Sequence, residues 1–162
     1  MIMEYIEGED GDKTTDHTSR IWNTLGIYAK KLHNIHVTGY GGHMVSPGIF
    51  KDRWDNFLEY NISQLTPDDR ALSLGIFTLE ESVAIKNVFE TLKNKNLRLG
   101  LSHYDLAPKN TRVDKQGNIY LIDWGSTTVL PSPHFDIAEI LDESLEDTSE
   151  NFKQFLNGYG LS

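Results

Sequence analysis

The stretch that decides the fold is His103-Tyr-Asp105-Leu-Ala-Pro-Lys-Asn110, followed later in the chain by Asp123-Trp-Gly125. Asp105 and Asn110 are five residues apart, and Asp123 comes thirteen residues after Asn110. Phosphoryl transfer from a nucleotide needs a carboxylate beside the accepting hydroxyl, and an amide oxygen and a second carboxylate that hold magnesium. The sequence therefore predicts a phosphoryl-transfer site with Asp105 as the catalytic group and Asn110 and Asp123 as metal ligands.

The two motifs together are more specific than either motif alone. The first has the spacing of the kinase catalytic loop, H-x-D-L-x-x-x-N, and Asp123-Trp-Gly occupies the place of D-F-G. Asp and Asn are also frequent in turns, so turn residues that flank a hairpin are one alternative. Turn chemistry does not require these two spacings. A site that keeps the residues but has lost the activity is a second alternative.

The composition narrows the class of partner. The chain has 162 residues, enough for one domain, with 24 acidic and 15 basic side chains and a net charge of −9. This charge argues against nucleic acid, which requires clustered basic residues, and slightly favours a cationic ligand. The chain contains no cysteine, no signal-peptide pattern and no apolar run of membrane-spanning length. We expect a soluble, cytoplasmic protein without a nucleic-acid or membrane partner.

Apolar spacing and turn residues predict the order of elements. We expect a short strand from Met1 to Ile6, an acidic loop over residues 7–12, helices over residues 15–35, from Trp54 onward, over residues 79–93 and from about residue 134 to Leu145, and loops at residues 38–42 and 46–48. In the third helix, Val83, Val88 and Leu92 are predicted on the buried side. Residues 111–113 and 119–122 flank a turn-rich segment and predict a β-hairpin that brings the three site residues to one end.

Two weaker patterns could indicate other chemistry. His33, His36 and His43 could suggest a zinc site, but no carboxylate or thiol completes a set of ligands, so packing and surface roles are favoured. The glycines at residues 39–42 could suggest a phosphate loop. That segment follows a helix rather than a strand and lacks the Lys-Ser/Thr that completes a P-loop, so a plain loop is favoured.

With these residues in view, the chain resembles the aminoglycoside phosphotransferase/choline kinase family of small-molecule kinases. The similarity extends over nearly the whole chain. It is carried by Met3-Glu-Tyr-Ile-Glu-Gly8, Leu32-His33, Gly39-Tyr-Gly41, Trp54, the two site motifs and His134-Phe-Asp136-Ile-Ala. One position departs from the family pattern, because Tyr104 stands where Gly is usual and adds bulk beside Asp105.

The resemblance implies a role for each matching residue. Asp105 would orient or deprotonate the acceptor hydroxyl, and Asn110 and Asp123 would bind Mg²⁺. The backbone around Glu4 and Ile6 would hold the adenine edge of ATP, or the base of GTP. His103 and Asp136 would be structural and brace the catalytic loop.

The resemblance also implies a fold and a division of the chain. We expect an α+β, mainly helical fold like the C-terminal lobe of a protein kinase, with a short β-hairpin. Residues 1–7 would be a hinge or strand remnant and residues 8–162 the lobe, with the N-terminal lobe missing. The strand from Met1 to Ile6 would leave an unpaired edge, which we expect to pair with a second copy, to be disordered or to fold back.

The acceptor is predicted to be a small hydroxylated molecule rather than a protein. Protein kinases need a long segment after D-F-G that ends in Ala-Pro-Glu. Here thirteen residues separate Asp123 from Asp136, and Ala-Pro-Glu is absent. The sequence does not separate an aminoglycoside, a choline-like amine and a sugar. The alternative function is a non-catalytic, kinase-like remnant that acts as a binding module.

Overall fold

A computed structural model describes residues 5–15, 18–144 and 150–161 of the chain. Within these residues the structure has six α-helices and two antiparallel sheets. The helices are α1 (Thr18–His33), α2 (Trp54–Gln64), α3 (Arg70–Ser73), α4 (Leu79–Lys93), α5 (Phe135–Ser144) and α6 (Glu150–Tyr159). The strands are β1 (Glu9–Asp10), β2 (Tyr40–Ser46), β3 (Ile49–Asp52), β4 (Gly100–Ser102), β5 (Thr111–Val113), β6 (Ile119–Leu121) and β7 (Thr128–Leu130). The predicted mixture of helices and strands is confirmed, whereas a second sheet beside the predicted hairpin was not expected.

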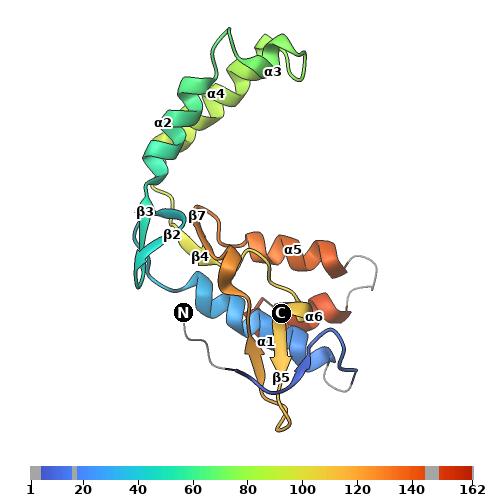
Figure 1. Cartoon of the computed structure of the whole chain (residues 1–162). Coiled ribbons are helices and arrows are strands. Elements are labelled where there is room, and N and C mark those ends of the chain that lie inside the picture. The colour runs from blue at the N-terminus through green and yellow to red at the C-terminus, as the bar shows by residue number, and fades with distance from the viewer. Residues whose placement is uncertain (1–4, 16–17, 145–149, 162) are drawn as a thin grey trace.

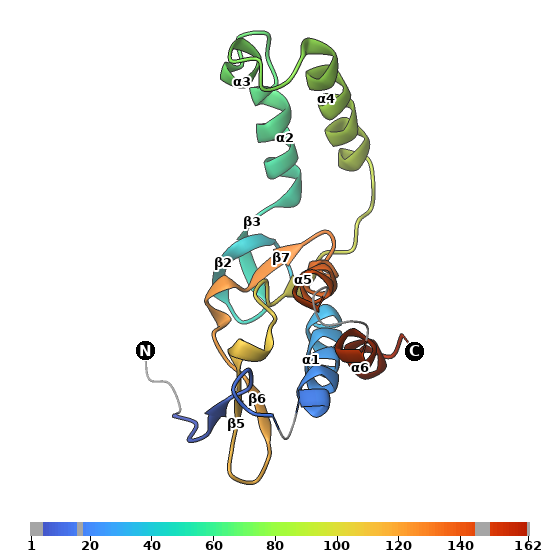
Figure 2. The ribbon, with the colours of Figure 1, turned by 90° about the vertical axis from the view of Figure 1, so that its right-hand side faces the viewer.

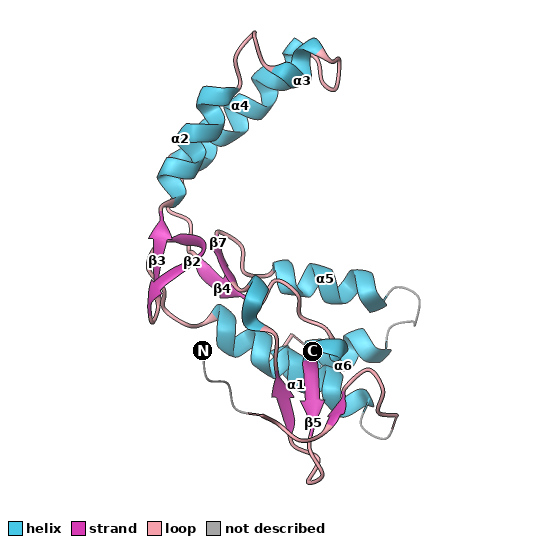
Figure 3. Ribbon diagram, in the orientation of Figure 1, coloured by secondary structure: helices cyan, strands magenta, loops and turns pink. Residues whose placement is uncertain are grey.

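The molecule consists of a body and an arm. The arm is the helical unit α2–α3–α4, which projects from the end of the β2–β3 hairpin, and the body contains the other helices and strands (Figure 1). Figure 3 shows that the strands form two groups, one at the base of the arm and one at the opposite end of the body. The first group has the order β3-β2-β7-β4 and the second the order β1-β5-β6. No helix in the described part of the chain is both long and apolar enough to cross a membrane.

The core of the body forms where α1 packs against α6. Leu25 and Ala29 of α1 lie on one helical face and are fully buried, as is Phe155 of α6. Figure 2 shows the two helices side by side. They approach so closely that a Cβ atom on Gly26 would lie 2.1 Å from the Phe155 carbonyl oxygen, and one on Gly158 would lie 1.9 Å from the Asn23 carbonyl oxygen. Both positions therefore exclude any side chain. Helix α6 was not predicted from the sequence.

The arm is built differently, and one prediction about it is wrong. Helix α4 has the predicted bounds and begins with a capping box between Thr78 and Glu81. Val83 and Val88, however, are 52% and 58% exposed rather than buried. The apolar spacing correctly indicates a helix, but no described element covers the face that these valines occupy.

The hairpin β5–β6 is confirmed, with Thr111 opposite Leu121 and Val113 opposite Ile119. The two loops predicted between α1 and α2 are wrong in part. They belong to the twisted hairpin β2–β3, whose turn contains Gly48 in the left-handed conformation (φ +74°). Glycine is favoured there because it carries no Cβ. The glycine-rich sequence indicates a loop, although most of its backbone pairs as a strand.

The N-terminal prediction is also corrected. Residues 1–4 lie outside the described part of the chain, and residues 5–7 have no regular structure. The strand lies instead in the predicted acidic loop, where β1 pairs with β5. Asp10 contacts Arg112 across the paired strands, and Glu7, just before β1, accepts a 2.6 Å hydrogen bond from the exposed Lys115. Helix α5 begins where predicted and is described as far as residue 144.

Candidate active site

Asp105 and Asn110 lie in the loop between β4 and β5, which ends in the short 3-10 helix η1 (Pro108–Asn110). The Asn110 side chain is buried, and its Nδ2 donates a 2.7 Å hydrogen bond to the Asp105 carbonyl oxygen. This bond ties the two motif residues to each other. It also uses the nitrogen end of the amide, so the Asn110 oxygen is the end left for another partner.

Backbone and side-chain hydrogen bonds connect the loop to Asp123. The Ile122 amide donates to the Asn110 carbonyl oxygen at 2.9 Å, and His103 Nε2 donates to the Ile122 carbonyl oxygen at 3.0 Å. His103 is fully buried, so this contact is shielded from water. Asp123 follows Ile122 directly. The structure therefore brings the motif that contains Asp105 and Asn110 next to the segment that carries Asp123, as the hairpin prediction requires.

Asp123 has an uncommon backbone conformation. Its φ and ψ angles are 58° and 62°, in the left-handed region, and it precedes the 3-10 helix η2 (Trp124–Ser126). Such conformations are costly for residues other than glycine and cluster at functional sites. Gly125 lies beside this carboxylate, since a Cβ atom on it would make an ordinary van der Waals contact of 3.4 Å with Asp123 Oδ1. The Asp123 side chain is exposed.

Asp105 is a partly exposed carboxylate with a basic neighbour. Lys109 Nζ lies 3.0 Å from Asp105 Oδ1. Partial burial opposes ionisation, but the Lys109 ammonium and the Asn110 side chain outweigh it and hold the pKa of Asp105 below its ordinary value. At neutral pH Asp105 is therefore an acceptor of hydrogen bonds. Sequence reasoning did not single out Lys109, although its position four residues after Asp105 was a usable signal.

Asp136, at the start of α5, holds the beginning of the catalytic loop. Its carboxylate is fully buried and accepts hydrogen bonds from the Ser102 hydroxyl at 2.7 Å and from the amides of His103 and Tyr104 at 3.0 and 2.9 Å. Burial acts to raise the pKa of Asp136, but these donors and His33 hold it below its ordinary value. The contacts of His103 and Asp136 fit the bracing role that the resemblance implies.

Tyr104 has a left-handed backbone (φ +64°), a conformation that glycine adopts most readily, so the backbone fits the glycine expected there from the resemblance. Its ring stacks on Phe135 with centroids 4.7 Å apart, and both rings are about 40% exposed. The ring is thus held against α5, and bulk beside the Asp105 carboxylate stays a prediction. Sequence reasoning missed Phe135 as its partner.

The residues present are compatible with a divalent cation of the oxygen-seeking type. No group of three or more His, Cys, Asp or Glu suited to a metal exists among the described residues. A magnesium ion in a nucleotide complex needs fewer, because it takes one or two carboxylates together with phosphate oxygens and water. The Asn110 oxygen and the Asp123 carboxylate are of this type. His33 does not belong to a zinc site, since its ring contacts Asp136 and Tyr159.

Of the two residues predicted beside the nucleotide base, the structure describes only Ile6. Glu4 lies outside the described residues. Ile6 is half-buried and lines a shallow pocket with Tyr5 and Tyr120 on the side of the β5–β6 hairpin. The adenine site around Glu4 and Ile6 stays a prediction.

With this geometry established, the comparisons with known proteins identify the class. The model of the phosphotransferase enzyme family matches residues 1–161, and the chain belongs to this family. The family resemblance inferred from the sequence is thereby confirmed. Comparison with curated proteins finds no match.

Two solved structures support the same fold. The chain is 18% identical to the protein in the gentamicin–APH(2")-IIa complex, with a TM-score of 0.53, covering 96% of this chain and 54% of that one. It is 20% identical to spectinomycin phosphotransferase, APH(9)-Ia, solved with ADP and spectinomycin, with a TM-score of 0.51 and coverages of 96% and 51%. Choline kinase LicA from Streptococcus pneumoniae is 22% identical, with a TM-score of 0.48 and coverages of 96% and 50%. The chain thus spans about half the length of these structures.

Proposed function

We propose that the protein transfers the γ-phosphoryl group of ATP or GTP to a hydroxyl group of a small molecule. The observation that carries the proposal is the hydrogen-bonded connection between Asp105, Asn110 and the residue before Asp123, in a chain that belongs to the phosphotransferase enzyme family. Relatives of this fold were solved with ADP and spectinomycin and with gentamicin, which supports a nucleotide donor and a hydroxylated acceptor. The net charge of −9 favours a cationic acceptor.

Each residue has a distinct task in this proposal. Asp105, a carboxylate at neutral pH, accepts a hydrogen bond from the acceptor hydroxyl and aligns it for attack. Asn110 and Asp123 bind Mg²⁺, which when bound neutralises charge on the nucleotide phosphates. Lys109, beside Asp105, adds positive charge near the group that is transferred. Positioning and charge neutralisation supply most of the catalysis in phosphoryl transfer.

The domain assignment and the location are part of the same proposal. Residues 8–162 act as the kinase-like C-terminal lobe, and residues 1–7 act as the hinge. This division follows the resemblance of residues 3–8 to the hinge of the family and of the two site motifs to its signature. The nucleotide requirement fits the predicted cytoplasmic location.

Self-association through residues 1–6 also remains a proposal, and within that segment the described Tyr5 is 81% exposed. Light scattering of the chain with and without residues 1–6 tests it.

Phosphoryl transfer tests the function directly. Two forms of the protein are tested: the chain alone, and the chain extended by any segment that is encoded in frame before Met1. Each form is incubated with magnesium, with ATP or GTP as donor, and with gentamicin, spectinomycin, choline or a neutral sugar as acceptor. Phosphorus NMR detects a phosphorylated product. Asp105→Asn should lower turnover by roughly 10²- to 10⁴-fold while nucleotide binding persists, because no metal ligand is changed. Near-full transfer by this variant would refute the assignment of Asp105.

The metal ligands give a contrasting result. Asp123→Ala should weaken magnesium–nucleotide binding as well as turnover, since it deletes a carboxylate ligand of a hard cation. Asn110→Ala should have an intermediate effect, because it removes one neutral oxygen. If neither form of the wild-type protein transfers phosphate to any acceptor, the alternative of a non-catalytic binding module is favoured.

A further inference from the structure

His33, the last residue of α1, connects two parts of the body through both nitrogens of its ring. Nε2 lies 3.1 Å from Asp136 Oδ2, and Nδ1 lies 2.9 Å from the hydroxyl oxygen of Tyr159 at the end of α6. His33 is 4% exposed and Asp136 is fully buried. Hydrogen bonds in such a shielded environment are stronger than the same bonds in water.

The partners of the ring determine where its proton lies. The ionised carboxylate of Asp136 can only accept, so His33 Nε2 carries a hydrogen and donates it. In the neutral ring, Nδ1 is then the acceptor, and the Tyr159 hydroxyl donates to it. One tautomer satisfies both contacts.

Each oxygen of the Asp136 carboxylate accepts two hydrogen bonds, so rotation of the carboxylate would break some of them. Oδ1 accepts from the Ser102 hydroxyl and the Tyr104 amide, and Oδ2 accepts from the His103 amide and His33. The two amides belong to the residues directly before Asp105. The orientation of this carboxylate therefore fixes the position of the two residues that precede Asp105.

We propose that His33 is a positioning residue for the catalytic loop, acting through Asp136, and that Tyr159 holds it in the tautomer with hydrogen on Nε2. The proposal rests on the proposed function only where it assigns Asp105 to catalysis. Helix α6 takes part because Tyr159 lies one turn from Phe155, which is fully buried against α1. The contact between α1 and α6 is thereby linked to the site.

Hydrogen exchange measured by NMR on the chain itself tests the proposal without turnover. In His33→Leu, which removes the donor, the amides of His103 and Tyr104 should exchange roughly tenfold or more faster, as expected for loss of a hydrogen bond to a charged group. The Asp114 amide, bonded to the Asn118 carbonyl oxygen in the β5–β6 hairpin, should be unchanged. Equal acceleration of all three amides, or none, would overturn the proposal.

Two further variants keep the test decisive if His33→Leu fails to fold. In His33→Gln a side-chain N–H can still donate to Asp136, so exchange at His103 and Tyr104 should stay near wild type. Tyr159→Phe keeps the ring but removes the hydroxyl, and exchange there should rise by a smaller factor than in His33→Leu. Nitrogen-15 shifts of the wild-type His33 ring should show hydrogen on Nε2, and hydrogen on Nδ1 alone would contradict the proposal.

Turnover separates this inference from the proposed function. In a form of the protein that transfers phosphate, His33→Leu should lower kcat by about 10- to 100-fold with little change in the KM for nucleotide, and His33→Gln should retain most activity. If the exchange pattern holds but the wild type transfers nothing, the function fails and the positioning stands. If an active wild type lacks the exchange pattern, the positioning role fails.

Discussion

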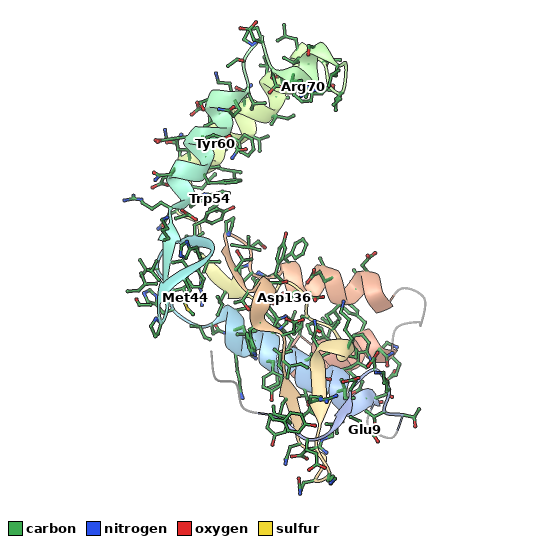
Figure 4. The ribbon with its side chains drawn as sticks, viewed as in Figure 1. Glu9, Met44, Trp54, Tyr60, Arg70 and Asp136 are labelled. Atoms are coloured by element: carbon green, nitrogen blue, oxygen red, sulfur yellow. The ribbon has the colours of Figure 1, made fainter. Side chains whose placement is uncertain are left out.

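The body and the arm use apolar residues in opposite ways. In the body, α1 and α6 bury Leu25 and Phe155 completely and meet at two glycines. In the arm, α4 exposes Val83 and Val88 on one face. Figure 4 shows Tyr60 and Arg70 on the arm, far from Asp136 in the body. Helical spacing therefore predicts α1 in the body and α4 in the arm equally well, whereas the burial of each helix depends on what packs against it.

The largest difference between the regions should appear when a core ring is removed. Phe155→Ala should lower the free energy of unfolding by about 3–5 kcal/mol, because it leaves a cavity between α6 and α1. Urea denaturation followed by tryptophan fluorescence measures this change. A loss below about 1 kcal/mol would show that α6 does not complete the core.

The buried carboxylate should make the stability of the body depend on pH. The pKa of Asp136 is depressed in the folded protein, so its contribution is full above the ordinary value of 3.8 and is lost as pH falls through the lower folded pKa. Asp136→Asn should therefore lower the free energy of unfolding by roughly 1.5–3 kcal/mol at pH 7. Denaturation of both proteins from pH 7 downward should show this difference shrinking below the ordinary value. A difference that is constant with pH would contradict the depressed pKa.

How far the sequence predicts the structure also differs between regions. The strand and turn pattern over residues 111–122 correctly predicts the β5–β6 hairpin, because strands joined by a short turn pair locally. The Ile122 amide accordingly bonds to the Asn110 carbonyl oxygen, next to Asp123. His33 and Tyr159 could not be paired, since they are far apart in sequence and meet only after α1 and α6 pack. His33 did carry a signal, because it lies four residues after Ala29 on the buried face.

The remaining errors have physical reasons of their own. Glycine-rich residues 38–42 suggested a loop because glycine is depleted in strands, yet β2 pairs with β3 and β7. Acidic residues 7–12 also suggested a loop, yet Glu9 and Asp10 form β1, in which Asp10 contacts Arg112 on the neighbouring strand. In both cases a distant partner decided the backbone structure.

The N-terminal cap of α4 should affect the stability of the arm but not that of the body. Thr78 Oγ1 accepts a hydrogen bond from the Glu81 amide at 3.2 Å, so Thr78→Ala should destabilise α4 by about 1 kcal/mol. Hydrogen exchange should accelerate in the first turns of α4 and stay constant in α1. Thr78→Ser, which keeps the hydroxyl, is the matched control. Equal acceleration in α1 would show that the arm and body unfold together.

The smallest effect is expected on the exposed face of the arm. Val88→Ala should change the free energy of unfolding of the chain by no more than about 0.5 kcal/mol, because Val88 is 58% exposed and loses little burial. The same urea titration used for Phe155→Ala measures it. A loss above about 1 kcal/mol would mean that another segment or a second copy covers this face in solution.

We propose that Asn110 and Asp123 form a metal–nucleotide site in this chain. The most direct measurement is NMR of the isotopically labelled chain with Mn²⁺–ATP, since manganese broadens signals of nearby amides even when binding is weak. Broadening should be strongest around Asn110 and Asp123, persist in Asp105→Asn and fall in Asp123→Ala, while amides of α4 stay sharp. Broadening centred on the arm, or unchanged by Asp123→Ala, would contradict the account.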